Sequence, residues 1–280
     1  MQHEQKNLFS GKWVRWPVVG AALLVLGGFL SITPPGLLGK ADGIGYAVCH
    51  RIEARSFHVH GRQLPLCARC TGEFNAAAIT LIFLGATSRK RSGLPPKGLL
   101  ALLAGFFLAF ALDGSNSYLY LLKQTYEGFL PQVPNLYTPN NSLRLLTGTG
   151  MGVTMASLLY PVVNQSLWRA PDERPALTWK GLGALLVVLL LVDLGILGES
   201  AAVLYPIALV SVLGTLALLT MVFGMLWIII MRQENAFESY RQLWLPALAG
   251  LTLALLLISG LDLFRLRLTG TWGGFPLGGA

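Results

Sequence analysis

The sequence predicts an all-α fold, a polytopic integral membrane helical bundle with about seven transmembrane helices. Hydrophobic residues make up 54% of the 280 residues and charged residues only 12%, whereas soluble domains carry about 25% charged residues. The mean hydropathy is +0.59, and long apolar runs recur along the chain. Inside a bilayer every backbone polar group needs a partner within the protein, so we expect these runs to form helices.

Seven apolar runs approach the ~20 residues that a helix needs to cross a bilayer. They cover about residues 16–33, 72–87, 98–114, 144–163, 181–198, 202–231 and 244–263. Little more than Gly198–Ser200 separates the fifth run from the sixth, which predicts a tight helical hairpin. Lys12 and Arg15 before the first run are compatible with a signal peptide, but no small-residue cleavage site follows, so we expect an uncleaved first span.

The same pattern divides the chain into four segments. Residues 1–15 are expected to form a cytoplasmic N-terminal tail, and residues 16–163 a membrane domain that contains a Cys/His/Arg-rich loop at 39–71. Residues 164–263 hold three further transmembrane helices, and residues 264–280 form a Gly-rich, flexible tail.

The distribution of basic residues argues for a lipid environment and against a nucleic-acid partner. The net charge is +8, but Lys and Arg flank the apolar runs and do not form one patch, as expected for membrane topology and contact with anionic lipid. Twelve of them lie on the N-terminal side of the membrane and nine on the other side. This bias predicts a cytoplasmic N-terminus and an outward-facing 39–71 loop.

The most informative stretch lies between the first two apolar runs and contains all three cysteines. Cys49-His50-Arg51 begins it, and Cys67-Ala68-Arg69-Cys70 ends it immediately before the second span. Thr71 is a candidate N-cap of that span. A thiol at a helix N-terminus beside Arg69 is expected to have a lowered pKa, which favours the thiolate needed for metal binding and for redox chemistry.

Three interpretations of the cysteines remain open. Cys49, Cys67, Cys70 and a histidine, with His50 the first candidate and His58 and His60 the others, would form a tetrahedral Cys₃His set suited to zinc. Alternatively, Cys67 and Cys70 form a redox-active dithiol with Cys49 as the resolving thiol. In the third interpretation the cysteines are packing residues, or two of them form a static disulfide.

Arginines accompany the cysteines. Arg51, Arg55, Arg62 and Arg69 fall within nineteen residues, and guanidinium groups bind phosphate or carboxylate in a bidentate way. Asn141 and Arg144 at the start of the fourth span add a second candidate anion site, with Asn and Ser residues available to cap that helix. Pairing with acidic helix ends or with anionic lipid is the alternative role. Gly148 and Gly152 more simply allow close helix packing.

Acidic residues lie within or beside several spans. Asp113, Asp193 and Asp262 end the third, fifth and seventh runs, and Glu73 opens the second. Alternating helix directions place all four on the face that carries the 39–71 loop. Ionisable groups at such positions are costly and indicate function by default, so we expect either a pocket beneath the loop or simple neutralisation of buried arginines.

Together these motifs resemble those of a family of predicted polytopic prokaryotic membrane proteins of unknown function. The resemblance covers roughly residues 40–155. It is carried by Cys49-His50-Arg51, Arg55-Ser56-Phe57, Leu64-Pro65-Leu66-Cys67-Ala68-Arg69-Cys70-Thr71-Gly72, Asp113-Gly114, Asn141-Ser142-Leu143-Arg144 and Thr147-Gly148. It implies a prokaryotic plasma membrane and the same motif residues, but no reaction. Glu73-Phe74 departs from the apolar pair expected there, and the last three spans have no counterpart.

The preferred functional hypothesis is an enzyme-like site at the outer membrane face. A metal, with zinc as the candidate, would be held by Cys49, His50, Cys67 and Cys70. Arg55, Arg69 and Asp113 are the candidate catalytic residues, and Arg51, Asn141 and Arg144 the candidate substrate-binding residues. The expected substrate is an anionic lipid or a lipid-linked molecule that arrives laterally. The alternatives are a membrane thiol–disulfide oxidoreductase that reduces a quinone, and a non-enzymatic carrier or assembly subunit.

Overall fold

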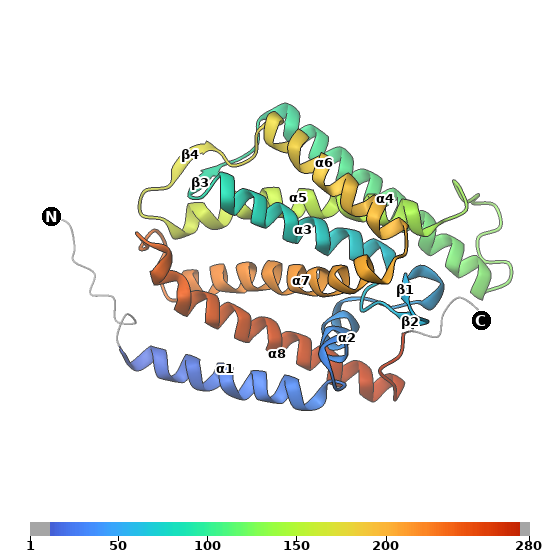
Figure 1. The fold of residues 1–280 in the computed structure, drawn as a ribbon, viewed down its shortest axis with the longest axis horizontal. Coiled ribbons are helices and arrows are strands. Elements are labelled where there is room, and N and C mark those ends of the chain that lie inside the picture. The colour runs from blue at the N-terminus through green and yellow to red at the C-terminus, as the bar shows by residue number, and fades with distance from the viewer. Residues whose placement is uncertain (1–11, 275–280) are drawn as a thin grey trace.

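The computed structural model describes residues 12–274 and confirms the expected all-α, multi-pass membrane bundle (Figure 1). The first part of the predicted N-terminal tail and the end of the predicted C-terminal tail lie outside these residues. Seven helices are long and apolar enough to cross a membrane. They are α1 (Lys12–Ile32), α3 (Ala68–Thr87), α4 (Lys97–Thr125), α5 (Asn141–Leu167), α6 (Trp179–Leu197), α7 (Ala201–Ile230) and α8 (Trp244–Thr269).

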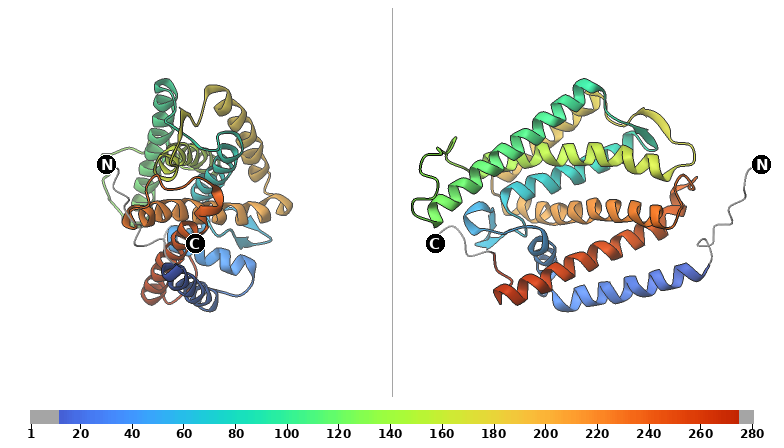
Figure 2. Two further views of the ribbon diagram at one scale, coloured as in Figure 1. Left: turned by 90° about the vertical axis from the view of Figure 1, so that its left-hand side faces the viewer. Right: turned by 180° about the vertical axis from the view of Figure 1, so that it is seen from behind.

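The short elements gather at the two ends of the bundle. At one end lie α2 (Leu37–Val48), the 3₁₀ helix η1 (Glu53–Arg55) and the antiparallel strands β1 (His58–Val59) and β2 (Arg62–Gln63). At the other lie the parallel strands β3 (Arg91–Gly93) and β4 (Asp172–Pro175) and the 3₁₀ helix η2 (Tyr240–Leu243). The long helices run between these ends (Figures 1 and 2), so the ends correspond to the two membrane faces.

The structure differs from the sequence-based expectation mainly beside the motif. Residues 39–48, expected in a loop, belong to α2. This helix has only 12 residues, too few to cross a bilayer, so hydropathy alone does not reveal it. Helix α4 continues to Thr125, well past the expected end at residue 114. Its final turns carry polar residues and therefore lack the apolar signal of a span.

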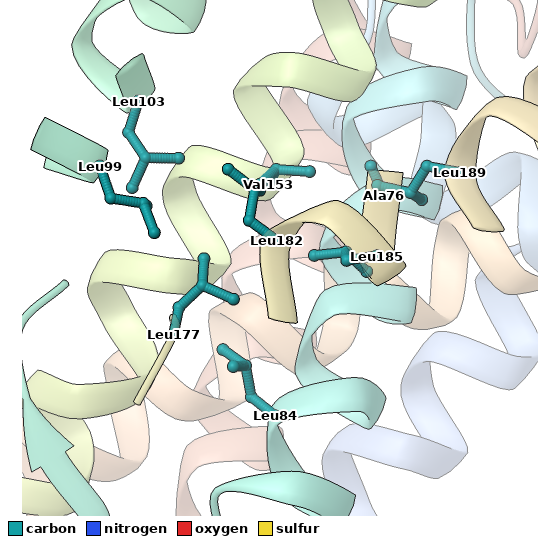
Figure 3. Packing of buried hydrophobic residues seen from close by; sticks show 9 residues of the cluster. All are labelled: Ala76, Leu84, Leu99, Leu103, Val153, Leu177, Leu182, Leu185 and Leu189. Carbon is teal, nitrogen blue, oxygen red and sulfur yellow. The ribbon is translucent and has the colours of Figure 1, made fainter. Parts of the chain in front are cut away.

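One apolar core joins α3, α4, α5 and α6. Figure 3 shows Leu99 and Leu103 of α4, Val153 of α5 and three leucines of α6 packed beside Ala76 and Leu84 of α3. The turn between α6 and α7 is as short as expected, but α6 inclines away from α7 (Figure 1) and packs in this core. The expected hairpin is therefore a tight turn without side-by-side packing of its two helices.

Glycines bring α3 and α5 into backbone contact. A Cβ atom at Gly152 would lie 2.0 Å from the carbonyl oxygen of Glu73, and one at Gly148 would lie 2.1 Å from that of Arg69. Gly72 has the reciprocal relation to Leu145, at 2.3 Å. The expected packing role of Gly148 and Gly152 is thus confirmed. This contact sets the distance between the Cys67–Cys70 turn of α3 and the start of α5.

The glycine contact predicts a strong position dependence for one added methyl group. Gly152→Ala should lower the free energy of unfolding by about 3 kcal/mol or more, because the methyl group overlaps a backbone carbonyl that cannot rotate away. Gly85→Ala, in α3 with nothing within 4 Å of its Cβ position, should be neutral or stabilising by up to about 1 kcal/mol. Thermal unfolding in detergent measures both, and equal effects would contradict the close packing.

Candidate metal and anion site

Three thiols converge where α2 ends and α3 begins. Cys49 is the C-cap of α2, Cys67 is the N-cap of α3, and Cys70 lies in the first turn of α3. Their three sulfur atoms all lie within 4.8 Å of one another. A tetrahedral zinc site with Zn–S bonds of ~2.3 Å places its sulfurs ~3.8 Å apart, so a small closure of the cluster suffices.

The backbone helps to hold this cluster together. The Sγ atom of Cys49 accepts hydrogen bonds from the backbone amides of Cys67 and Arg51, at 3.3 and 3.4 Å. Thr71 does not cap α3 as proposed above, because the N-cap is Cys67, four residues before it, and the Thr71 hydroxyl donates to the carbonyl of Leu66. The helix N-terminus therefore lies at Cys67 itself.

The thiols of the cluster differ in pKa because they hydrogen-bond to one another. Hydrogen bonds from the thiols of Cys49 and Cys70 lower the pKa of Cys67 well below its usual value, which confirms the expected direction. The pKa of Cys49 is raised to about 12, because its thiol donates to Cys67 and is also buried. The cluster thus favours one thiolate stabilised by two neighbouring thiols, which is a suitable starting state for metal binding or for nucleophilic attack.

His50 lies beside this cluster without belonging to it. Its side chain is exposed, and its ring nitrogens are not part of the group of ligand atoms within 4.8 Å of one another. It does line the same cavity as the three cysteines. His58 and His60 lie on or beside β1 and are not among the residues that line this cavity.

The thiols open onto a cavity of about 350 Å³ that also exposes four arginines. Its size falls within the ~300–1,000 Å³ that is usual for small-molecule sites. Its lining comes from the 49–55 segment and from α3, α4 and α5: Cys49, His50, Arg51, Ile52, Arg55, Cys67, Arg69, Cys70, Gly114, Tyr118, Leu121 and Arg144. The cysteine and arginine motifs of the sequence therefore form one site.

Arg69 is fixed in this cavity by Asp113. Its guanidinium group donates to Asp113 Oδ2 from both Nε, at 3.2 Å, and Nη2. Tyr137 donates to Asp113 Oδ1 at 2.7 Å, and Thr147 donates to Oδ2 at 3.3 Å. Asp113 is 1% exposed and does not line the cavity, so it orients Arg69 and does not itself face a ligand.

Asn116, three residues after Asp113, anchors the loop that follows α4. Its amide side chain donates to the carbonyl of Tyr137 at 3.0 Å and accepts from the amide of Leu136 at 2.9 Å. The 126–140 segment is thereby held against α4, with the hydroxyl of Tyr137 directed at Asp113. Burial and this hydrogen bond raise the pKa of Tyr137 to about 12, so the phenol keeps its proton well above neutral pH.

Arg55 and Arg144 bring further positive charge into the cavity. Arg55 donates to the carbonyl of Ser117 at 3.0 Å, and its pKa is lowered by burial and by the nearby charge of Arg69. Arg144, 6% exposed, donates to the side chain of Asn141 at 2.8 Å, while its Nε has no hydrogen-bond partner. Among the described residues neither arginine forms a salt bridge. The site therefore has more buried positive charge than its carboxylates neutralise.

Arg51 has a largely structural environment. It pairs with Asp42 of α2 at 3.0 Å, and Asp42 also pairs with Arg62 at 2.6 Å. A second Arg51 nitrogen donates to the carbonyl of Trp272 at 3.2 Å. Its backbone φ of 53° lies in the left-handed region, which is costly for a non-glycine residue and turns the chain sharply after Cys49.

Of the four acidic residues expected on this face, Asp113 binds Arg69 and Glu73 lies near Cys67 and Arg69, whereas Asp193 and Asp262 have other surroundings. Asp193 accepts from Thr149 at 3.0 Å, on the α5–α6 side of the bundle. Asp262 is fully buried in α8, and none of the described residues donates a hydrogen bond to it. Neither residue lines the cysteine–arginine cavity.

Several residues of the site carried no recognisable signal in the sequence. Tyr137 lies in a loop, Ser117 lies beyond the expected end of its span, and Asp42 lies in the unexpected helix α2. Helical spacing would have linked Ser117 to Asp113 and Gly114 had the full length of α4 been anticipated. For Tyr137 no local pattern existed.

Comparisons with known proteins agree with a membrane protein family of unknown function. Residues 49–158 match the model of a family described as "Predicted membrane protein (DUF2085)". An uncharacterized protein of Methanocaldococcus jannaschii is 23% identical over 122 residues, which cover 44% of this chain and 67% of that protein. No solved structure matches the chain. The matched region contains the cysteines, Arg55, Arg69, Asp113 and Arg144, but neither α7 nor α8.

The buried Arg69–Asp113 pair predicts an uneven response to loss of a carboxylate charge. Asp113→Asn should reduce the free energy of unfolding by about 3 kcal/mol, because it leaves a buried guanidinium without its counter-charge. Tyr137→Phe should cost about 1 kcal/mol. Asp172→Asn, which breaks an exposed pair with Arg174, should leave the melting temperature unchanged. Similar melting temperatures for Asp113→Asn and Asp172→Asn would refute the proposed role of Asp113.

Proposed function

We propose that the protein holds one zinc ion through Cys49, Cys67 and Cys70, with His50 as the fourth ligand. The observation that carries this proposal is the convergence of three sulfurs within 4.8 Å on a cavity that His50 also lines. His50 is an exposed residue beside Cys49, and a turn of its ring toward the sulfurs would complete the ligand set. A zinc ion with these four ligands would have a closed coordination shell and would fix the end of α2 to the start of α3 next to the arginines; Lewis-acid chemistry would require His50 to leave its position.

The second part of the proposal is that the cavity binds the anionic group of a lipid or lipid-linked substrate. Arg55, Arg69 and Arg144 present guanidinium groups, which suit bidentate binding of phosphate oxygens. Asp113 fixes Arg69, and Asn141 fixes Arg144. Arg51 also lines the cavity, with part of its guanidinium group already paired with Asp42. An anion between Arg55 and Arg144 would balance charge that the described carboxylates leave uncompensated.

The proposal also includes a location for the site in the membrane. The bias of basic residues favours a cytoplasmic N-terminus, which would put the cysteine–arginine cavity at the outer face, and the family resemblance implies a prokaryotic plasma membrane. A substrate dissolved in the outer leaflet would then reach the cavity by lateral diffusion, without crossing the bilayer.

One observation favours a second candidate, a membrane thiol–disulfide oxidoreductase. Cys67 has a lowered pKa and lies one helical turn from Cys70, as in redox-active C-x-x-C pairs. Oxidation would join the sulfurs of Cys67 and Cys70 and release two electrons and two protons, which a quinone would take up to become a quinol. Cys49 would act as the resolving thiol.

Zinc content is the first test. The purified wild-type protein should contain about one zinc per chain, and Cys49→Ser, Cys67→Ser and Cys70→Ser should each lose it. His50→Ala should bind zinc about 10–100-fold more weakly, whereas the control His58→Ala should bind normally. Zinc affinity should rise with pH, because zinc must displace the proton that Cys49, with a pKa of about 12, retains at neutral pH. A metal-free wild type would rule out the zinc site.

The thiol state separates the two candidates. With zinc bound, all three thiols should resist alkylation until a chelator is added, and all three should then react, because none is in a disulfide. An oxidoreductase should instead show two oxidised thiols that become alkylated only after reduction and that reoxidise with a quinone. Cys49→Ser should leave the Cys67–Cys70 disulfide intact in that case. Mass spectrometry of the alkylated protein distinguishes the patterns.

A further inference from the structure

An apolar groove adjoins the cysteine–arginine cavity. It has a volume of about 260 Å³ and runs between α2 and the C-terminal half of α8. Its apolar lining consists of Ala47, Val48, Leu261, Phe264 and Leu268. Phe264 and Leu268 are 62% and 71% exposed, so the groove is open along the side of the bundle that faces lipid.

The groove and the cavity meet at two residues. Cys49 and His50 line both of them. On the groove side of this junction the lining is mostly apolar, with Arg265 and Thr269 as its polar side chains, and on the cavity side it carries Arg55, Arg69 and Arg144. An apolar channel that ends at a cluster of arginines is complementary to an amphiphile with an anionic head and a hydrocarbon chain.

Several contacts fix the segment at Cys49 and His50, where the groove and the cavity meet. Arg265 of α8 donates to the carbonyl of Cys49 at 2.6 Å and to that of His50 at 3.2 Å. Its guanidinium group also lies over the ring of Tyr46 at 3.9 Å. A guanidinium at the C-terminal end of α2 is favourably placed with respect to the helix dipole. The junction between groove and cavity is therefore a defined part of the fold.

We infer that the groove between α2 and α8 binds the hydrocarbon chain of an anionic phospholipid whose phosphate lies among Arg55, Arg69 and Arg144. This inference rests on the proposed anion-binding cavity and extends it with a chain-binding site outside the region that matches the membrane protein family. The buried Nε of Arg144, which has no hydrogen-bond partner, provides a donor for the phosphate.

Photo-crosslinking from α8 tests the inference. A benzophenone amino acid replaces Leu268 in the groove or, as a matched control, Leu263, which is exposed on α8 but does not line the groove. The full chain is reconstituted in phosphatidylcholine nanodiscs with a minor fraction of phosphatidylglycerol. Crosslinked lipid at position 268 should be enriched in phosphatidylglycerol about tenfold over the bilayer, as expected for a charge-assisted contact. Position 263 should report the bulk composition.

Substitution of the cavity arginines provides the second part of the test, because these residues are proposed to bind the lipid phosphate. Arg144→Gln and Arg55→Gln should each abolish the enrichment at position 268, whereas Arg267→Gln, an exposed arginine of α8 outside both spaces, should preserve it. Melting temperatures confirm that each variant is folded. The same lipid composition at positions 268 and 263, or enrichment that persists in both Arg144→Gln and Arg55→Gln, would overturn the inference.

Zinc content of the same samples keeps the two proposals apart. Enrichment at position 268 in protein without zinc would support the lipid site and contradict the metal site. Absence of enrichment in protein that contains zinc would overturn the lipid site alone.

Discussion

The backbone contact between α3 and α5 is the constraint on which the site depends. Gly72, Gly148 and Gly152 allow the two helices to approach until a carbonyl of one fills the place of a side chain on the other. In a bilayer the hydrophobic effect does not drive helices together, so such close packing is a main source of association. It brings the first turns of both helices, with their cysteines and arginines, to one face at a fixed separation.

Buried positive charge sets the chemistry that follows. Removing a guanidinium group from water costs several kcal/mol unless an anion or several acceptors replace the water. Arg69 and Arg51 have carboxylate partners, whereas Arg55 and Arg144 rely on a carbonyl and an amide oxygen. The cavity next to the three thiols thus contains positive charge that the described carboxylates do not neutralise. A ligand with negative charge is the simplest means of neutralising it, in accordance with the proposed function.

The sequence predicted the seven spans well, because each one is a long apolar run whose length a bilayer dictates. It also predicted that the cysteines and Arg69 belong together, because they are close in the chain.

The prediction from sequence failed for segments that do not need to be long and apolar to cross the bilayer. Helix α2 is too short to register as a span, and the polar end of α4 continues past its apolar run. The partners Tyr137 and Asp42 depend on tertiary contacts that leave no periodic trace. The expected face of Asp193 and Asp262 did not tell whether they reach the cavity, because depth in the membrane does not determine which way a helix face points; neither lines it.

Arg265 couples the thiol cluster to the C-terminal part of the chain. Two of the three sulfurs belong to α3, but the carbonyl of the third, Cys49, is held by a side chain from α8, a helix outside the matched region at 49–158. In a protein that lacked α8, the carbonyl of Cys49 would need another donor, such as a second subunit or a different local contact. The C-terminal helices therefore take part in the geometry of the thiol cluster, and a change in α8 is expected to alter the metal affinity of residues more than two hundred positions earlier in the chain.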